Sequence, residues 1–104
     1  MLTSRTTLFL RIALFAVLLI GAGCQTSMPV QEMSDARQAI SAAKEAGAAE
    51  HAADDLEAAE DYLESAQKNL KAHNYTIARS DAVEAKTKAL DALRRSEAVQ
   101  ATED

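Results

Sequence analysis

The chain has 104 residues and a formal net charge of −5 at pH 7, which allows one small domain. Its 16 acidic and 11 basic residues give a surface that repels phosphates, which argues against nucleic-acid binding and against a polybasic mode of membrane binding. The single cysteine cannot form a disulfide within the chain.

The first 23 residues differ in composition from the rest. Arg5 adds positive charge near the N-terminus, residues 12–20 are all apolar, and the small residues 21–23 follow. This three-part layout is typical of a secretory signal. The uninterrupted apolar run is shorter than the roughly 20 residues that span a bilayer. We therefore expect residues 1–23 to be a cleaved export signal.

Cys24 directly follows these small residues. The stretch Leu19–Cys24 resembles the lipobox of bacterial lipoproteins, although Gly21 stands where that family usually has Leu. The resemblance implies cleavage between Gly23 and Cys24, a diacylglyceryl thioether on the Cys24 sulfur and an N-acyl group. It also implies sorting to the outer membrane, because Gln25 replaces the Asp that retains lipoproteins at the inner membrane. The alternatives are an uncleaved anchor helix and plain secretion with an accidental cysteine.

After the cysteine, residues 24–29 are expected to form a lipidated tether and residues 30–100 a helical domain. Pro29, the only proline, suits the start of a helix. From residue 30 onward 20 residues are Ala, the best helix former. The first predicted helix covers residues 30–46 and stops at Gly47. A continuous helix over residues 30–72 is the alternative, since only Gly47 interrupts it.

The second predicted helix covers residues 53–72. Its apolar residues have heptad spacing, its first turn is acidic, and Lys68 and Lys71 in its last turn suit the helix dipole. A break follows, with Asn74 as N-cap of a third helix over residues 75–99. Residues 101–104 are expected to fray. Favourable i,i+4 pairs join Glu64 to Lys68 and Asp91 to Arg95.

The third predicted helix carries a continuous stripe of small residues. A stripe of this kind lets helix axes approach closely. We predict an all-α fold, either an antiparallel hairpin of the second and third helices or a three-helix bundle with the first packed alongside. The candidate face for an envelope partner or a second copy is Ala78, Ala82, Ala85, Ala89 and Ala92.

Residues 28–96 resemble the exported bacterial family of the domain of unknown function numbered 4398. The shared features are Pro29, the stretches 36–40 and 46–48, and alanines spaced behind Leu56, Leu63 and Tyr75. One departure is Ala53, where members often carry proline. The resemblance implies a periplasmic helical module, often lipoprotein-borne, with no assigned activity. Residues 75–85 also resemble half of a tetratricopeptide repeat, but the chain has no room for an array.

The sequence offers little support for a catalytic or metal-binding site. Its histidines, His51 and His73, are 22 residues apart, whereas zinc sites need converging ligands. We interpret Glu50, His51 and the acidic residues at 54–55 as solvated side chains at helix ends. The acidic run at 54–64 lacks the glycine-centred loop of a calcium site. We expect no enzyme activity, no metal, no cofactor beyond the covalent lipid, and no small-molecule substrate.

Two functions fit these features. The first is a lipid-anchored interaction module on the periplasmic face of the outer membrane, binding an envelope protein or another copy of itself. The second is a structural envelope lipoprotein resembling the major murein lipoprotein and self-associating as a coiled coil. That family ends in a lysine joined to peptidoglycan, whereas this chain ends Thr102-Glu103-Asp104.

Overall fold

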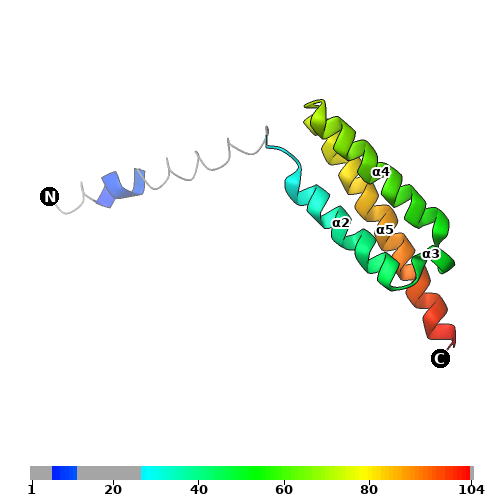
Figure 1. The fold of residues 1–104 in the computed structure, drawn as a ribbon. Helices are drawn as coiled ribbons and strands as arrows, with labels where there is room; N and C mark the ends of the chain where they lie inside the picture. The colour runs from blue at the N-terminus through cyan, green and yellow to red at the C-terminus, as the bar shows by residue number, and fades with distance from the viewer. Residues whose placement is uncertain (1–5, 12–26, 104) are drawn as a thin grey trace.

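The computed structural model describes residues 6–11 and 27–103. The expected signal cleavage and lipidation positions, Gly23 and Cys24, and the sorting residue Gln25 lie outside the described residues. The fold is all-α, as predicted: apart from a short helical stretch at residues 6–11, it consists of α2 (Val30–Glu45), α3 (Ala48–His51), α4 (Ala53–Lys71) and α5 (Tyr75–Glu103) (Figure 1). Among the described helices, none combines the length and apolar character needed to cross a bilayer.

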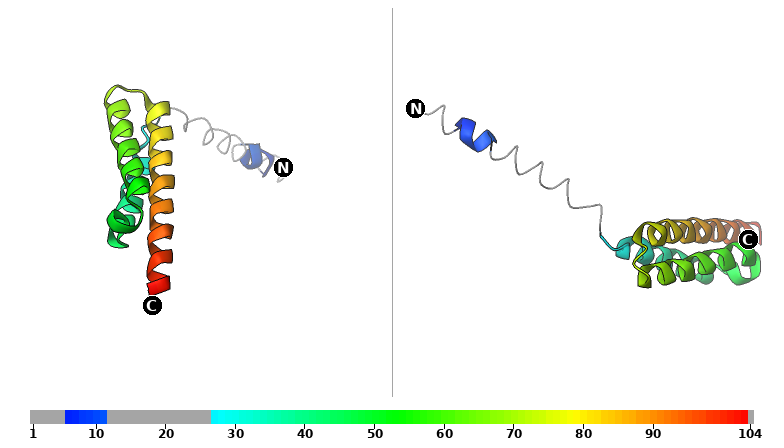
Figure 2. Two further views of the ribbon diagram at one scale, coloured as in Figure 1. Left: turned by 90° about the vertical axis from the view of Figure 1, so that its right-hand side faces the viewer. Right: turned by 90° about the horizontal axis from the view of Figure 1, so that it is seen from above.

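The helices α4 and α5 form an antiparallel hairpin, and α2 packs alongside α5 in the same direction as α5 (Figures 1 and 2). Helix α2 contacts α5 more extensively than it contacts α4. This arrangement confirms the predicted hairpin with the first helix packed beside it. Because α5 touches every other element of the bundle, its buried face determines how closely the helices approach.

The first turn shows why the chain does not form one helix over residues 30–72. Gly47 adopts a left-handed conformation with φ of 87°, and its N–H donates to the carbonyl of Lys44 at 3.0 Å. Glycine occupies this conformation at no steric cost, so it ends α2. After the single turn of α3, Ala52 is extended (φ −149°), and α4 starts in a new direction. The continuous-helix alternative is therefore wrong.

The second turn ends α4 in a similar way but with a histidine. His73 has φ of 61°. Its N–H donates to the Leu70 carbonyl at 3.1 Å, and the Asn74 N–H donates to the Asn69 carbonyl at 2.8 Å, the paired bonds of a left-handed helix stop. The carbonyl of Asn74 accepts the first bond of α5, from Ala78. Its side-chain amide, expected as a cap, points back to the Asn69 side chain at 3.5 Å.

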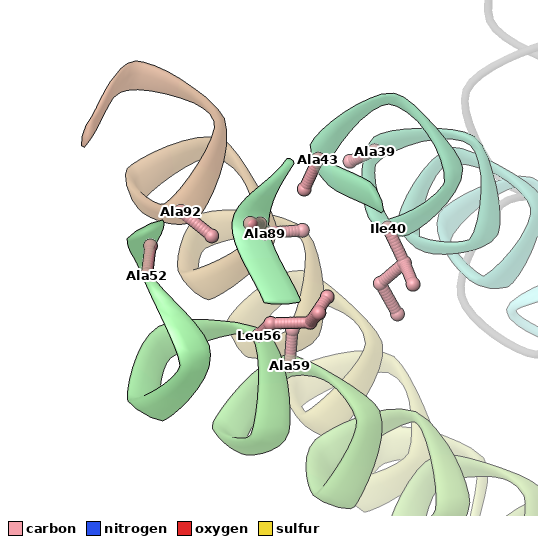
Figure 3. Close-up of a cluster of buried hydrophobic side chains, with 9 residues drawn as sticks. Ala39, Ile40, Ala43, Ala52, Leu56, Ala59, Ala89 and Ala92 are labelled. Carbon is pink, nitrogen blue, oxygen red and sulfur yellow. The ribbon is translucent and has the colours of Figure 1, made fainter. Parts of the chain in front are cut away.

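The interior consists mainly of alanine. A large cluster joins α2, α3, α4 and α5 around Ile40 and Leu56 (Figure 3). A smaller one joins Met33, Ala66 and Ala82, with Leu70 packed against it. Since alanine contributes little apolar area, the stability of this bundle depends on close backbone approach more than on large side chains.

The last helix is longer than expected. The sequence predicted fraying from residue 101, whereas α5 continues to Glu103 and projects beyond α3 (Figures 1 and 2). The side-chain amide of Gln100 donates to the Ala46 carbonyl at 2.9 Å. This bond ties the end of α5 to the first turn of the bundle, which explains why the helix persists past residue 99.

Candidate functional site

The backbone that follows the expected lipidation position is docked on the bundle. Arg79 in α5 donates from Nη2 to the Ser27 carbonyl at 2.6 Å. The same guanidinium donates from Nε to the Glu32 carboxylate at 3.2 Å. Pro29 between these contacts is fully buried. The tether is therefore fixed to the bundle from Ser27 onward, three residues after Cys24.

The predicted partner face lies inside the bundle. All five alanines of the stripe have no exposed surface, and Ser96 continues the stripe by one more turn. The hydroxyl of Ser96 is satisfied by the carbonyl of Ala92 at 2.8 Å. The stripe does permit close helix approach, as the spacing predicted, but the helices that approach it belong to the same chain. The alanine stripe is therefore not accessible to another molecule in this structure.

On the outer side of α5, two large apolar side chains remain exposed. Val83 is 48% exposed and Leu90 38%, and their seven-residue spacing puts them on one face of the helix. Thr87 lies between them and donates its hydroxyl to the Val83 carbonyl at 3.0 Å. Val83, Thr87 and Leu90 are called the outer strip below. Periodicity alone did not single them out, because the alanine stripe is the stronger pattern on α5.

A polar seam joins α4 to α5. The carboxylate of Asp81 accepts from the Ser65 hydroxyl at 2.7 Å and from the Asn69 amide at 3.0 Å. The amide of Asn69 also donates to the Ser65 carbonyl at 3.0 Å. Sequence reasoning missed this seam. A usable signal was present, since Ser65 and Asn69 are one turn apart beside the apolar stripe of α4.

Charged pairs outside the seam are mostly exposed. Glu64 and Lys68 form the expected i,i+4 pair at 3.3 Å. The expected Asp91–Arg95 pair is wrong, because Arg95 reaches across to Asp55 on α4 at 3.0 Å while Asp91 pairs with Arg94. Exposed pairs of this kind contribute little to stability.

The polar cluster around His51 includes the positively charged side chain of Arg95. An open depression is lined by Glu50, His51, Asp54, Asp55 and Arg95, among others. The Arg95 guanidinium lies against the Asp55 carboxylate there. Within residues 6–11 and 27–103, no three metal-ligating side chains converge. The second histidine, His73, lies at the other end of the bundle, where its Nδ1 is 2.9 Å from the Tyr75 hydroxyl.

Comparison with known proteins identifies a family for most of the chain. The family model described as "Domain of unknown function (DUF4398)" matches residues 31–104. The match includes all of α3, α4 and α5 and nearly all of α2. No curated protein and no solved structure matches the chain.

Proposed function

The chain belongs to the DUF4398 family, and from that premise we propose that it is a lipid-anchored interaction module of the bacterial cell envelope. Cys24 carries the lipid, the bundle of residues 30–103 faces the periplasm, and Gln25 directs the protein to the outer membrane. The bundle acts by binding and performs no catalysis. Two or three acyl chains hold such a protein firmly, since each buried CH₂ contributes about 0.8 kcal/mol.

One observation supports this proposal above the others: the docking of Ser27 by Arg79 so soon after Cys24. A long flexible linker would let a domain sample a wide volume around its anchor. Here the folded part begins three residues after the cysteine, and three extended residues span at most about 11 Å. The lipid and the bundle are thereby coupled in position.

The outer strip on α5 is the surface that we assign to the partner. It offers apolar contact at Val83 and Leu90, next to the hydroxyl of Thr87. The alanine stripe is unavailable, because α2 and α4 cover it. The second candidate function, a self-associating structural lipoprotein, uses the same strip, because its seven-residue spacing is that of a coiled-coil seam.

The anchor is tested with two variants in the producing bacterium. We expect Cys24→Ala to abolish incorporation of labelled palmitate and to leave unprocessed precursor at the inner membrane. We expect Gln25→Asp to remain acylated but to fractionate with the inner membrane. Normal processing and outer-membrane retention of Cys24→Ala would contradict the anchor.

The interaction is tested with a photo-reactive residue at position 90 in living cells. Glu57, exposed on α4, is the control position. We expect a discrete adduct from position 90 and none from position 57. An adduct with a different envelope protein supports the module, and an adduct with a second copy supports the structural alternative. Equal yield from both positions would contradict the assignment of the outer strip.

A further inference from the structure

Charge is unevenly distributed along the bundle. We divide it into an anchored half, residues 27–37 and 64–86, and a distal half, residues 38–63 and 87–103. The anchored half has five acidic and five basic side chains, whereas the distal half has ten acidic and four basic ones. All of the net negative charge of the bundle therefore lies in the distal half, away from the docked tether.

Exposed apolar side chains surround the end of the anchored half. Met28 is 55% exposed, Val30 61% and Ile77 53%. The first two flank the buried Pro29, and Ile77 is in the first turn of α5, two residues before the arginine that holds Ser27. Exposure of such side chains to water is unfavourable in free energy, whereas at a bilayer surface they can enter the boundary between headgroups and acyl chains.

Basic side chains lie at the same end. The last turn of α4 carries Lys68 and Lys71, and this turn leads directly into the α4–α5 connection. The pairing of Lys68 with Glu64 is exposed, so its ammonium group remains accessible. A basic residue near an anionic lipid surface is attracted to it over about a Debye length.

We propose that this end of the bundle is a membrane-contact surface for anionic phospholipids, formed by Met28, Val30 and Ile77 together with Lys68 and Lys71. The proposal rests on the lipid anchor proposed above, because three residues place the acylated Cys24 within about 11 Å of Ser27. The acidic distal half is repelled by the same lipids. The bundle therefore stands end-on, with α3 and the C-terminus of α5 directed away from the bilayer.

This orientation gives the outer strip a defined height. Val83 and Leu90 lie about 12 and 22 Å along α5 from its first residue, at 1.5 Å per residue. A partner at that height clears the headgroups yet remains close to the membrane. The 29-residue helix α5 would reach about 43 Å from its first residue.

The test uses the acylated full-length product reconstituted in vesicles of phosphatidylethanolamine and phosphatidylglycerol. A fluorophore is attached at Ile77→Cys or, as the matched control on the same helix, at Ala98→Cys; the Cys24 thiol is consumed by the lipid. A headgroup-level nitroxide lipid is the quencher. We expect quenching about threefold stronger at position 77, because the two sites are about 32 Å apart along α5.

A charge-reversed variant sharpens the test. We expect Lys68→Glu with Lys71→Glu to reduce quenching at position 77 about twofold in these vesicles, because two attractive charges become repulsive. Lys88→Glu in the distal half should leave it unchanged. Phosphatidylcholine vesicles should remove the difference between the variants.

Failure of this proposal and failure of the anchor are distinguishable, because the acyl content of each sample is measured by mass spectrometry. Equal quenching at positions 77 and 98 in acylated protein would overturn the contact surface and leave the anchor standing. Absence of acyl chains on Cys24 would overturn both.

Discussion

The anchored and distal halves of the bundle are stabilised in different ways. The distal half contains the larger cluster of buried apolar residues, with Ile40 and Leu56 among alanines. The anchored half has a smaller cluster around Met33, next to the polar seam at Asp81. A closely packed apolar core loses stability when a substitution changes the volume of a side chain. A half-buried polar seam loses stability when a single hydrogen bond is removed.

The same contrast appears in the two turns. The distal turn uses Gly47, for which a positive φ is free of strain, and a side chain there would meet His51. The anchored turn places His73 in the left-handed region, where a residue with a Cβ is disfavoured. The distal half is therefore the more constrained of the two. We therefore expect substitutions in the distal half to lower stability more than substitutions in the anchored half.

The largest effect is expected from enlarging the distal core. Ala89 is fully buried in the distal cluster, so Ala89→Leu would force α5 away from its neighbours. We expect it to lower the free energy of unfolding by about 2–3 kcal/mol, the upper part of the usual range for overpacking, as measured by urea denaturation. Ala98→Leu on the exposed side of the same helix is the control. Equal effects of the two would mean that the stripe is not closely packed.

The second largest loss of stability is expected from a substitution in the distal turn. Gly47→Ala puts a Cβ at φ of 87°, 3.3 Å from Cδ2 of His51. We expect a loss of about 1–2 kcal/mol, since a left-handed conformation is strained for any residue with a Cβ. The reciprocal change, His73→Gly, should be neutral or slightly stabilising in the same denaturation experiment. A stabilising Gly47→Ala would show that the turn adopts another backbone conformation.

The third largest loss of stability is expected from the polar seam between α4 and α5. Asp81→Ala removes the acceptor shared by Ser65 and Asn69. We expect a loss of about 1 kcal/mol, the usual value for a partly buried hydrogen-bond network. Glu84→Ala, one turn away and exposed, should change stability by less. Indistinguishable thermal melts for the two variants would contradict the role given to the seam.

The smallest global effect is expected at the tether. Arg79→Ala removes bonds to Ser27 and Glu32, yet its side chain is about one-third exposed, so we expect less than about 1 kcal/mol. The local effect is larger. The Met33 N–H, which donates to the Pro29 carbonyl, should exchange with deuterium about fivefold faster as the tether detaches. Arg37→Ala, exposed in α2, serves as the control; unchanged exchange in Arg79→Ala would mean that other contacts hold the tether.

Much of the fold could be predicted from the sequence because its signals are local. Gly47 and the 73–74 break interrupt long runs of helix formers, and the heptad spacing behind Leu56 identifies the buried face of α4. The predicted bounds of the first and second helices, residues 30–46 and 53–72, agree with α2 and α4 to within one residue. The small stripe on α5 also gave the correct expectation of close helix contact.

The rest depends on contacts between distant residues. Nothing near Arg95 in the sequence indicates that it reaches Asp55 and not Asp91, and nothing near Gln100 indicates its bond to Ala46. A stripe of alanines has the same periodicity whether it faces another helix of the chain or a partner. For this reason the sequence located a packing surface on α5 but not which molecule would cover it.

The most direct test of the central claim is the intact mass of the mature protein extracted from membranes of the producing bacterium. The account predicts an N-terminus at Cys24 with a diacylglyceryl group on sulfur and an acyl group on nitrogen. A free thiol at Cys24, or a chain that begins at any other residue, would contradict it.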